Sequence, residues 1–229
     1  MAEPPRVPNC TRRFSYRGWT NVFHLVPTND HLYATETLFG DWNSRVLLLA
    51  KDACPTSAIQ QASDWRHAQR ELGDKQGWRT NERLQRLLIP FPEKSFLYGS
   101  ASANMLYEDP GWSRSLSGFF AGDLHEFLKC VLSWVMESTP RLEWVACLGT
   151  EAWFLTCVTI GDFASATQFR ERRDSYKPSN GVVGKKEIKA FPLFHPAARV
   201  RLQVMERGWQ AFEARLSSNT RENKRSNVN

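Results

Sequence analysis

The feature that most constrains the fold is the alternation of short apolar runs with longer amphipathic segments between residues 45 and 216. Short apolar runs are typical of buried strands, whereas apolar residues three and four positions apart are typical of helices. Strands that alternate with helices indicate βα units around a mostly parallel sheet. The sequence therefore predicts an α/β fold, a three-layer α/β/α sandwich with a central, mostly parallel four-stranded sheet.

Four segments have the character of strands: Arg45–Ala50, Ser95–Tyr98, Trp144–Leu148 and Ile188–Phe194. Pro192 interrupts the last segment, which places it near an edge or a bulge because proline cannot donate to a strand ladder. Helices are expected over roughly Thr56–Arg70, Thr80–Leu88, Ser115–Ser138, Thr150–Val158 and Pro196–Leu216, where Pro196 suits a first helical position.

The two ends of the chain differ in composition from its centre. Residues 1–13 contain three prolines and no periodicity, so we expect an N-terminal arm there, followed by a single domain over residues 14–216. Residues 217–229 contain one apolar residue and are expected to form a disordered basic tail. No apolar stretch follows a basic start, and no run is long enough to cross a membrane, so a cytoplasmic protein is expected, nucleoid-associated in a bacterium.

The cysteines and the net charge indicate the chemical class of the partner. The five cysteines are scattered without the short spacing of a zinc or iron–sulfur site, which predicts reduced thiols and no metal. The formal charge of +6 and pI of about 9.2 favour an anionic partner such as a phosphate backbone. We expect a monomer with an anionic partner that carries phosphate, and no membrane.

Chemistry-bearing residues follow each predicted strand, where ligands bind in open α/β sheets. Lys-Asp-Ala-Cys-Pro follows the first strand from Lys51, Ser-Ala-Asn ends at Asn104 after the second, and Leu-Gly-Thr-Glu-Ala begins at Leu148. His-Pro-Ala-Ala-Arg follows the fourth from His195. Each residue has a structural alternative: Asp52 as a helix cap, Asn104 as a turn former and His195 as a structural histidine.

In this order, the motifs resemble the uracil-DNA glycosylase superfamily over roughly residues 40–215. The resemblance implies that Asp52 orients or activates the attacking water and that His195 donates a hydrogen bond to the departing base. It implies a cofactor-free branch, because the cysteine spacing of the iron–sulfur branches is missing. Ala53 and Cys54 stand where the best-known branch has proline and the tyrosine that excludes thymine.

The resemblance also implies a pocket for a flipped base and contacts to DNA. The base-binding residues are Lys51, Ala53, Cys54, Trp78 and Asn104. Trp78 would stack on the base, and Asn104 would form hydrogen bonds to the base edge. Trp65 is the alternative stacking residue, and either tryptophan could instead belong to the hydrophobic core. The DNA-binding or wedge set is Ser100, Pro196, Ala197, Arg199 and Arg201, with a solvated basic helix face as the alternative for the arginines.

A further basic region precedes the fourth strand and either grips the DNA backbone or is a solvated loop. Its members are Arg170, Arg172, Arg173, Lys177, Lys185 and Lys186. The expected activity is that of a monofunctional uracil-DNA glycosylase in base-excision repair, which leaves an abasic site without a cofactor or metal. The alternatives are a same-fold glycosylase for hypoxanthine, xanthine or mismatched thymine, and a DNA damage-binding protein without turnover.

Overall fold

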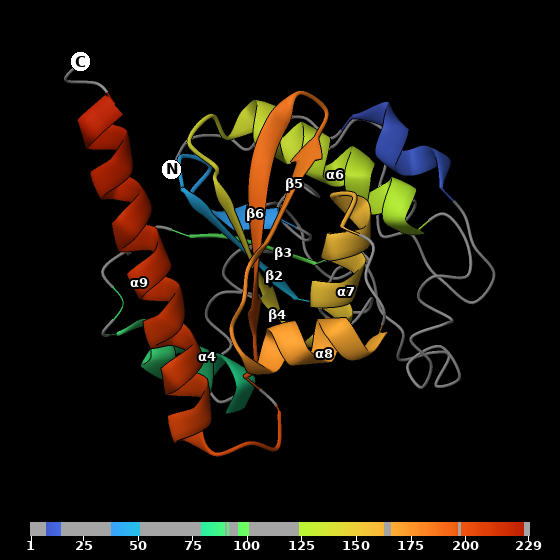
Figure 1. Cartoon of the computed structure of the whole chain (residues 1–229). Helices are drawn as coiled ribbons and strands as arrows, with labels where there is room; N and C mark the ends of the chain where they lie inside the picture. Colours follow the sequence, from blue (N-terminus) through green and yellow to red (C-terminus); the bar gives the residue numbers. More distant parts are fainter. Residues whose placement is uncertain are drawn as a thin grey trace.

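The computed structural model describes residues 8–14, 38–50, 79–89, 91, 96–100, 124–162, 166–196 and 198–226 of the chain. These residues form a mixed α/β structure with one central sheet (Figure 1). The strands are β1 (Leu38–Gly40), β2 (Val46–Ala50), β3 (Leu97–Ser100), β4 (Trp144–Leu148), β5 (Ser179–Val183) and β6 (Lys186–Leu193).

The described sheet has six strands in the order β1-β3-β2-β4-β6-β5, so the prediction of four strands is wrong. The four predicted strands are the inner ones, and all their mutual pairings are parallel. The two additional strands pair antiparallel at the edges. Sequence analysis missed them because β1 has only three residues and β5 reads Ser-Asn-Gly-Val-Val, which has no apolar alternation.

Pro192 lies inside β6 but beyond the end of the neighbouring edge strand. It pairs with Cys147 of β4, whereas β5 pairs only with residues 186–190. The strand was predicted to lie near an edge or a bulge, and β6 lies next to the edge strand β5.

Helices cover both faces of the sheet because its strands are apolar on both sides. One core cluster joins Leu47, Val145 and Ala190 with helices α6 (Leu124–Ser138) and α7 (Thr150–Thr159). The other cluster joins residues of the opposite face with helices α4 (Arg79–Leu88) and α9 (Leu202–Ser226); its strand members include Val46, Leu48, Trp144 and Phe191. Phe212 of α9 packs in a tilted arrangement against Phe191, with ring centres 4.9 Å apart.

The expected helices agree in part with those of the structure. Helices α4 and α7 match their predicted ranges closely, and α6 buries its whole apolar stripe, including Leu124, Phe127 and Val131. The expected helix over residues 56–70 lies outside the described residues. Helix α8 (Ala166–Asp174) was not predicted, because its sequence ATQFRERRD has almost no apolar residues.

The predicted start of the last helix at Pro196 is wrong. The Ala198 amide donates to the His195 carbonyl at 2.8 Å, as in a turn, and α9 begins only at Leu202. The carbonyl oxygens of Pro196 and Ala198 accept from Arg83 and are not used in helix bonds. At its other end, α9 continues through Ser226 into the segment that we expected to be disordered. Once a helix is nucleated by packing, each further residue adds a hydrogen bond at low entropic cost.

The N-terminal segment also differs from the expected arm. Residues Asn9–Arg13 form a 3-10 helix, η1, that contacts α6. Phe14 packs edge-on against Phe127 at 5.6 Å, and Cys10 forms a disulfide with Cys130. The prediction that all cysteines are reduced is therefore wrong for this pair, whereas Cys147 and Cys157 are free and buried. Packing between segments 120 residues apart cannot be read from cysteine spacing.

Candidate functional site

The topology defines one edge of the sheet as the candidate site. The chain passes from β2 outward to β3 on one side and then to β4 and β6 on the other, so the order reverses between β2 and β4. In open α/β sheets, ligands bind at the carboxyl ends of the strands at such a reversal. The loops that begin after Ala50, Leu148 and Leu193 all leave the sheet at this edge.

The register places these strand ends at the same level. Ala50 pairs with Ser100, Leu49 with Cys147, and Leu148 with Leu193. Asp52 follows the end of β2 by two residues, and His195 follows the end of β6 by two residues. Since neighbouring strands lie about 4.8 Å apart, β2 and β6, on either side of β4, are separated by about 10 Å.

None of the predicted base-binding residues can be compared with the structure. Lys51, Asp52, Ala53, Cys54, Trp65, Trp78 and Asn104 lie outside the described residues, as does Ala197. Of Ser100, the structure describes the backbone, which ends β3 beside Ala50. The described part of the predicted site is therefore its His195 side.

Helix α4 holds the loop that carries His195. Arg83 Nη1 donates to the carbonyl oxygens of Pro196 at 3.1 Å and Ala198 at 3.2 Å, which closes over the turn from His195 to Ala198. Pro196 is buried, whereas Arg199 and Arg201 are exposed. The two predicted wedge arginines thus follow directly after a turn whose Pro196 and Ala198 carbonyls are both held by Arg83.

His195 is half-buried, and its ionisation reflects that environment. Burial lowers the pKa of His195 below the ordinary value for histidine, while the negative charge of Glu151 raises it in part. Desolvation is the larger of the two effects, so the neutral imidazole is favoured near neutral pH. A neutral imidazole can donate one hydrogen bond, and a protonated one can donate two.

The loop after β4 lies directly beside His195. Gly149 adopts φ 104° and ψ 167°, a conformation that is open essentially to glycine alone. A Cβ on Gly149 would lie 3.4 Å from the Cβ of His195 and 3.9 Å from Oε2 of Glu151. Gly149 therefore brings the start of α7 against the histidine.

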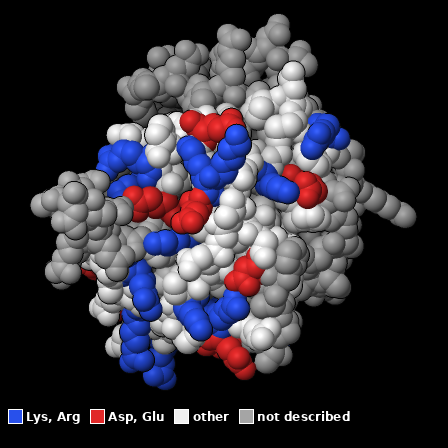
Figure 2. Space-filling model, turned by 45° about the horizontal axis from the view of Figure 1, so that its top comes forward, with Lys and Arg blue, Asp and Glu red and all other residues white. Residues whose placement is uncertain are grey.

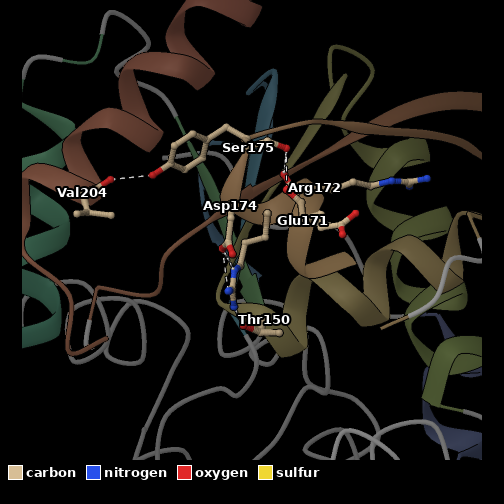
Figure 3. A network of polar contacts seen from close by, with 8 residues as sticks. Thr150, Glu171, Arg172, Asp174, Ser175 and Val204 are labelled. Atoms are coloured by element: carbon tan, nitrogen blue, oxygen red, sulfur yellow. Dashed lines mark hydrogen bonds and ion pairs between the residues drawn. The ribbon is translucent and has the colours of Figure 1, made fainter. Parts of the chain in front are cut away.

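Helix α8 ends at the same edge and ties three elements together (Figure 3). Arg173 donates to Oγ1 of Thr150 at 2.8 Å, forms an ion pair with Asp174 and lies 5.6 Å from the ring centre of Phe194. The Tyr176 hydroxyl donates to the Val204 carbonyl of α9 at 2.9 Å. The end of α8 is thus linked to α7 through Thr150 and to the ring of Phe194, the residue before His195, and the residues that follow α8 are linked to α9 through Val204.

The predicted basic region is divided between two ends of the molecule. Arg173 lies at the carboxyl edge, whereas Lys186 starts β6 and donates to the Met136 carbonyl at 2.6 Å. Since a strand rises about 3.3 Å per residue, the two ends of β6 are roughly 23 Å apart. Arg172 is paired with Asp162 at 2.5 Å. The idea of one basic region is therefore wrong.

Charges of both signs share the surface drawn in Figure 2. Lysine and arginine side chains are interspersed there with aspartate and glutamate rather than merged into one basic field. Of the described members of the predicted basic region and wedge set, Arg170, Lys177, Lys185, Lys186, Arg199 and Arg201 are exposed, and Arg199 and Arg201 follow the His195 turn.

The free thiols have no nucleophilic role at this edge. Burial raises the pKa of Cys147 to about 12 and raises that of Cys157 further. Since the thiolate is the reactive form, both remain inert at neutral pH. Within the described part of the chain, no group of three or more His, Cys, Asp or Glu side chains lies close enough together to hold a metal ion.

Sequence reasoning missed two residues that shape the site, Glu151 and Arg83. Glu151 stands at a predicted strand end, so its position could have marked it as a second carboxylate. Arg83 carries no local signal, because its partner Pro196 is 113 residues away in sequence. Arg173 was predicted as part of a basic region, whereas in the structure its side chain donates to Thr150.

Comparison with known proteins gives no family assignment for the chain. A scan against protein-family models and a search of curated proteins both return no match. Among the helices of the described residues, none is both long and apolar enough to cross a membrane.

Proposed function

We propose that the protein is a DNA glycosylase of base-excision repair that flips uracil out of DNA, hydrolyses its N-glycosidic bond and leaves an abasic site. One observation carries the proposal: the strands that precede Asp52 and His195 are parallel, end at the same level and flank the reversal of strand order. This arrangement supports the chemistry that the motif resemblance implies, because a carboxylate and an imidazole from distant parts of the sequence start from one edge.

The proposed reaction separates charge between the sugar and the base. As the bond from C1′ to the base breaks, its electron pair leaves with the base and positive charge develops on the deoxyribose. Asp52 stabilises that positive charge and accepts a proton from the attacking water, while His195 donates a hydrogen bond to the base oxygen that becomes negative. Asn104 would read the base edge, and Trp78 would stack on the base.

The DNA strand would contact the exposed cations beside the His195 turn. Arg199 and Arg201 follow that turn directly and are exposed, which suits contacts to phosphate or insertion where the base has left the stack. Because these contacts are electrostatic, binding should weaken steeply as salt rises. A binding constant that is flat with salt would contradict them.

The direct test is excision of a base from labelled oligonucleotides without metal. Substrates carry uracil, hypoxanthine, xanthine or a G·T mismatch, in single and double strands, and the readout is alkali-labile sites. We expect excision of uracil, with Asp52→Asn and His195→Ala each lowering the rate by about 100-fold or more at unchanged far-UV circular dichroism. Wild-type rates in both folded variants would overturn the assignment. The other bases test the same-fold alternatives, which the small Cys54 side chain leaves open.

A further inference from the structure

Tyr176 occupies a backbone position that usually belongs to glycine. Helix α8 ends in a Schellman cap, in which the Tyr176 amide donates to the Arg173 carbonyl at 3.1 Å and the Lys177 amide to the Arg172 carbonyl at 2.8 Å. The residue at this place in the cap adopts a positive φ, and Tyr176 has φ 51°. Among the described residues, it is the one non-glycine residue with a positive φ. Because a bulky side chain makes this conformation unfavourable, another contact must offset the strain.

The side chain of Tyr176 makes such a contact with α9. Its hydroxyl donates to the Val204 carbonyl at 2.9 Å (Figure 3). Its ring lies against Gly208, one helical turn further along α9, where a Cβ would lie only 2.8 Å from Cε1 of the ring and 3.4 Å from Cζ. A side chain at position 208 would therefore collide with the ring, so the ring packs directly on the main chain of the helix.

Two locally unfavourable residues meet in this contact. A glycine destabilises a helix interior, and a tyrosine is disfavoured in the left-handed conformation. The contact explains both, since Gly208 makes room for the ring and Tyr176 supplies it. Local preferences are violated most often where a fixed tertiary geometry or a function requires it. The pair therefore fixes the position of α9 relative to the end of α8.

The contact holds the part of α9 that follows the His195 turn. Val204 lies in the first turn of α9, and its amide donates to the Arg201 carbonyl at 3.0 Å. The Met205 amide donates to the same carbonyl at 3.4 Å. The main chain of Arg201 is thus bonded to the residue that Tyr176 binds. Helix α8 is in turn linked to α7 through its last turn, so the start of α9 is held against the rest of the fold.

We propose that Tyr176 is a positioning residue for DNA binding: it fixes the start of α9, so that Arg201 is presented to the phosphate backbone beside the His195 turn. This inference rests on the proposed function for the identity of the ligand. Arg201 is exposed, so the protein can hold its main chain but not its side chain before DNA binds. A group whose main chain is already fixed loses less conformational freedom on binding, which favours the complex.

The first test is amide hydrogen exchange in the full-length protein over residues 204–208. Tyr176→Phe removes the hydroxyl alone, whereas Tyr176→Gly removes the whole contact and leaves a residue that suits the cap of α8. Exchange should be about 3- to 10-fold faster in Tyr176→Phe, because one hydrogen bond to α9 is lost, and faster still in Tyr176→Gly. Ser175→Ala is the control, since its exposed hydroxyl bonds within the same cap and not to α9. Equal exchange in wild type and Tyr176→Gly would overturn the inference.

The second test is a double-mutant cycle on DNA binding, measured by fluorescence anisotropy with a labelled duplex that carries uracil. Arg201→Ala should weaken binding by about 10-fold in wild type and by less than about 3-fold in the Tyr176→Gly background, because Arg201 is no longer held in place there. An equal loss in both backgrounds would overturn the positioning role, since a merely structural effect of Tyr176 is additive. If wild type binds no DNA, the proposed function fails, and the exchange measurement still decides whether Tyr176 fixes the start of α9.

Discussion

Gly149 lies directly against His195, so close that a Cβ on the glycine would lie 3.4 Å from that of the histidine. The glycine adopts a positive φ of 104° at the end of β4, and the histidine leaves the end of β6. A Cβ at this position would make an ordinary van der Waals contact with the histidine, so the glycine is required by its backbone conformation rather than by lack of space.

Gly149→Ala should destabilise the protein and place a methyl group in contact with His195. The backbone conformation costs about 1–3 kcal/mol for a residue with a Cβ, measured as a loss of unfolding free energy in urea. Gly161→Ala is the matched control, because Gly161 also has a positive φ of 86° but open space around it. Both variants should lose stability, and only Gly149→Ala should shift the His195 NMR signals. Unchanged His195 signals in Gly149→Ala would contradict the close contact.

Arg83→Ala should loosen the turn that carries His195. Two charge-assisted hydrogen bonds to main-chain carbonyls are lost, at a cost of about 1–2 kcal/mol for a half-exposed side chain. If the proposed function holds, misplacement of the imidazole should lower the excision rate by about 10- to 100-fold. Arg83→Lys should retain part of the rate, since a lysine supplies the charge without the planar fork.

The control for Arg83 is Arg86→Ala on the exposed side of the same helix. It removes an equal charge from α4 without a contact to the His195 turn. The unfolding free energy should therefore change by no more than about 0.5 kcal/mol, and the excision rate should stay near that of wild type. Equal losses in both variants would show that the helix, rather than the turn, responds to the substitution.

Because of His195, the unfolding free energy of the protein should fall as the solution is acidified. Burial lowers its pKa in the native state, so below about pH 6.5 the unfolded chain binds a proton that the native chain does not. The stability from this neutral imidazole is present above that pH and is lost as pH falls toward the native pKa. His195→Gln should therefore lose less unfolding free energy between pH 7 and pH 5 than wild type.

His125→Gln, on the surface of α6, is the matched control for the loss of one histidine. Urea titrations at three or more pH values measure how the unfolding free energy of each protein changes with pH. If this change is the same for wild type and His195→Gln, burial does not perturb the pKa of the imidazole.

The inner sheet could be predicted from the sequence because its signal is local. Each parallel strand is buried on both faces and therefore reads as a short continuous apolar run, such as Val46–Ala50 and Trp144–Leu148. The edge strands could not be predicted, since β5 is half solvent-exposed and held by pairing with β6 rather than by its own composition. Helix α8 could not be predicted for the same reason, because its position depends on contacts with α7 and β6 rather than on its own composition.

The candidate site shows the same division. His195 could be predicted because an apolar strand leads directly into it, and its place at the carboxyl edge follows from the parallel pairing of β6 with β4. Arg83 could not, because its two acceptors are main-chain carbonyls more than 110 residues away. The start of α9 was mispredicted for a related reason: proline favours a first helical position, but Arg83 takes the carbonyls that a helix would use.

The disulfide between Cys10 and Cys130 should stabilise the protein under oxidising conditions. It closes a long loop, whose two cysteines are 120 positions apart in sequence, and fixes η1 on α6, so its loss should cost about 2–5 kcal/mol. Cys10→Ser, Cys130→Ser and the double variant should be equally destabilised relative to oxidised wild type, because either single substitution already removes the bond.

Reduction distinguishes this bond from packing alone. Dithiothreitol should lower the melting temperature of wild type toward that of the variants and leave the variants unchanged, since Cys147 and Cys157 are free. Peptide mapping after alkylation without reductant should recover Cys10 and Cys130 in one linked peptide pair. Complete alkylation of both thiols in the unreduced protein would show that the segment is held by the Phe14–Phe127 contact instead. In a reducing compartment, the pair is expected as thiols, and η1 would then depend on that aromatic contact.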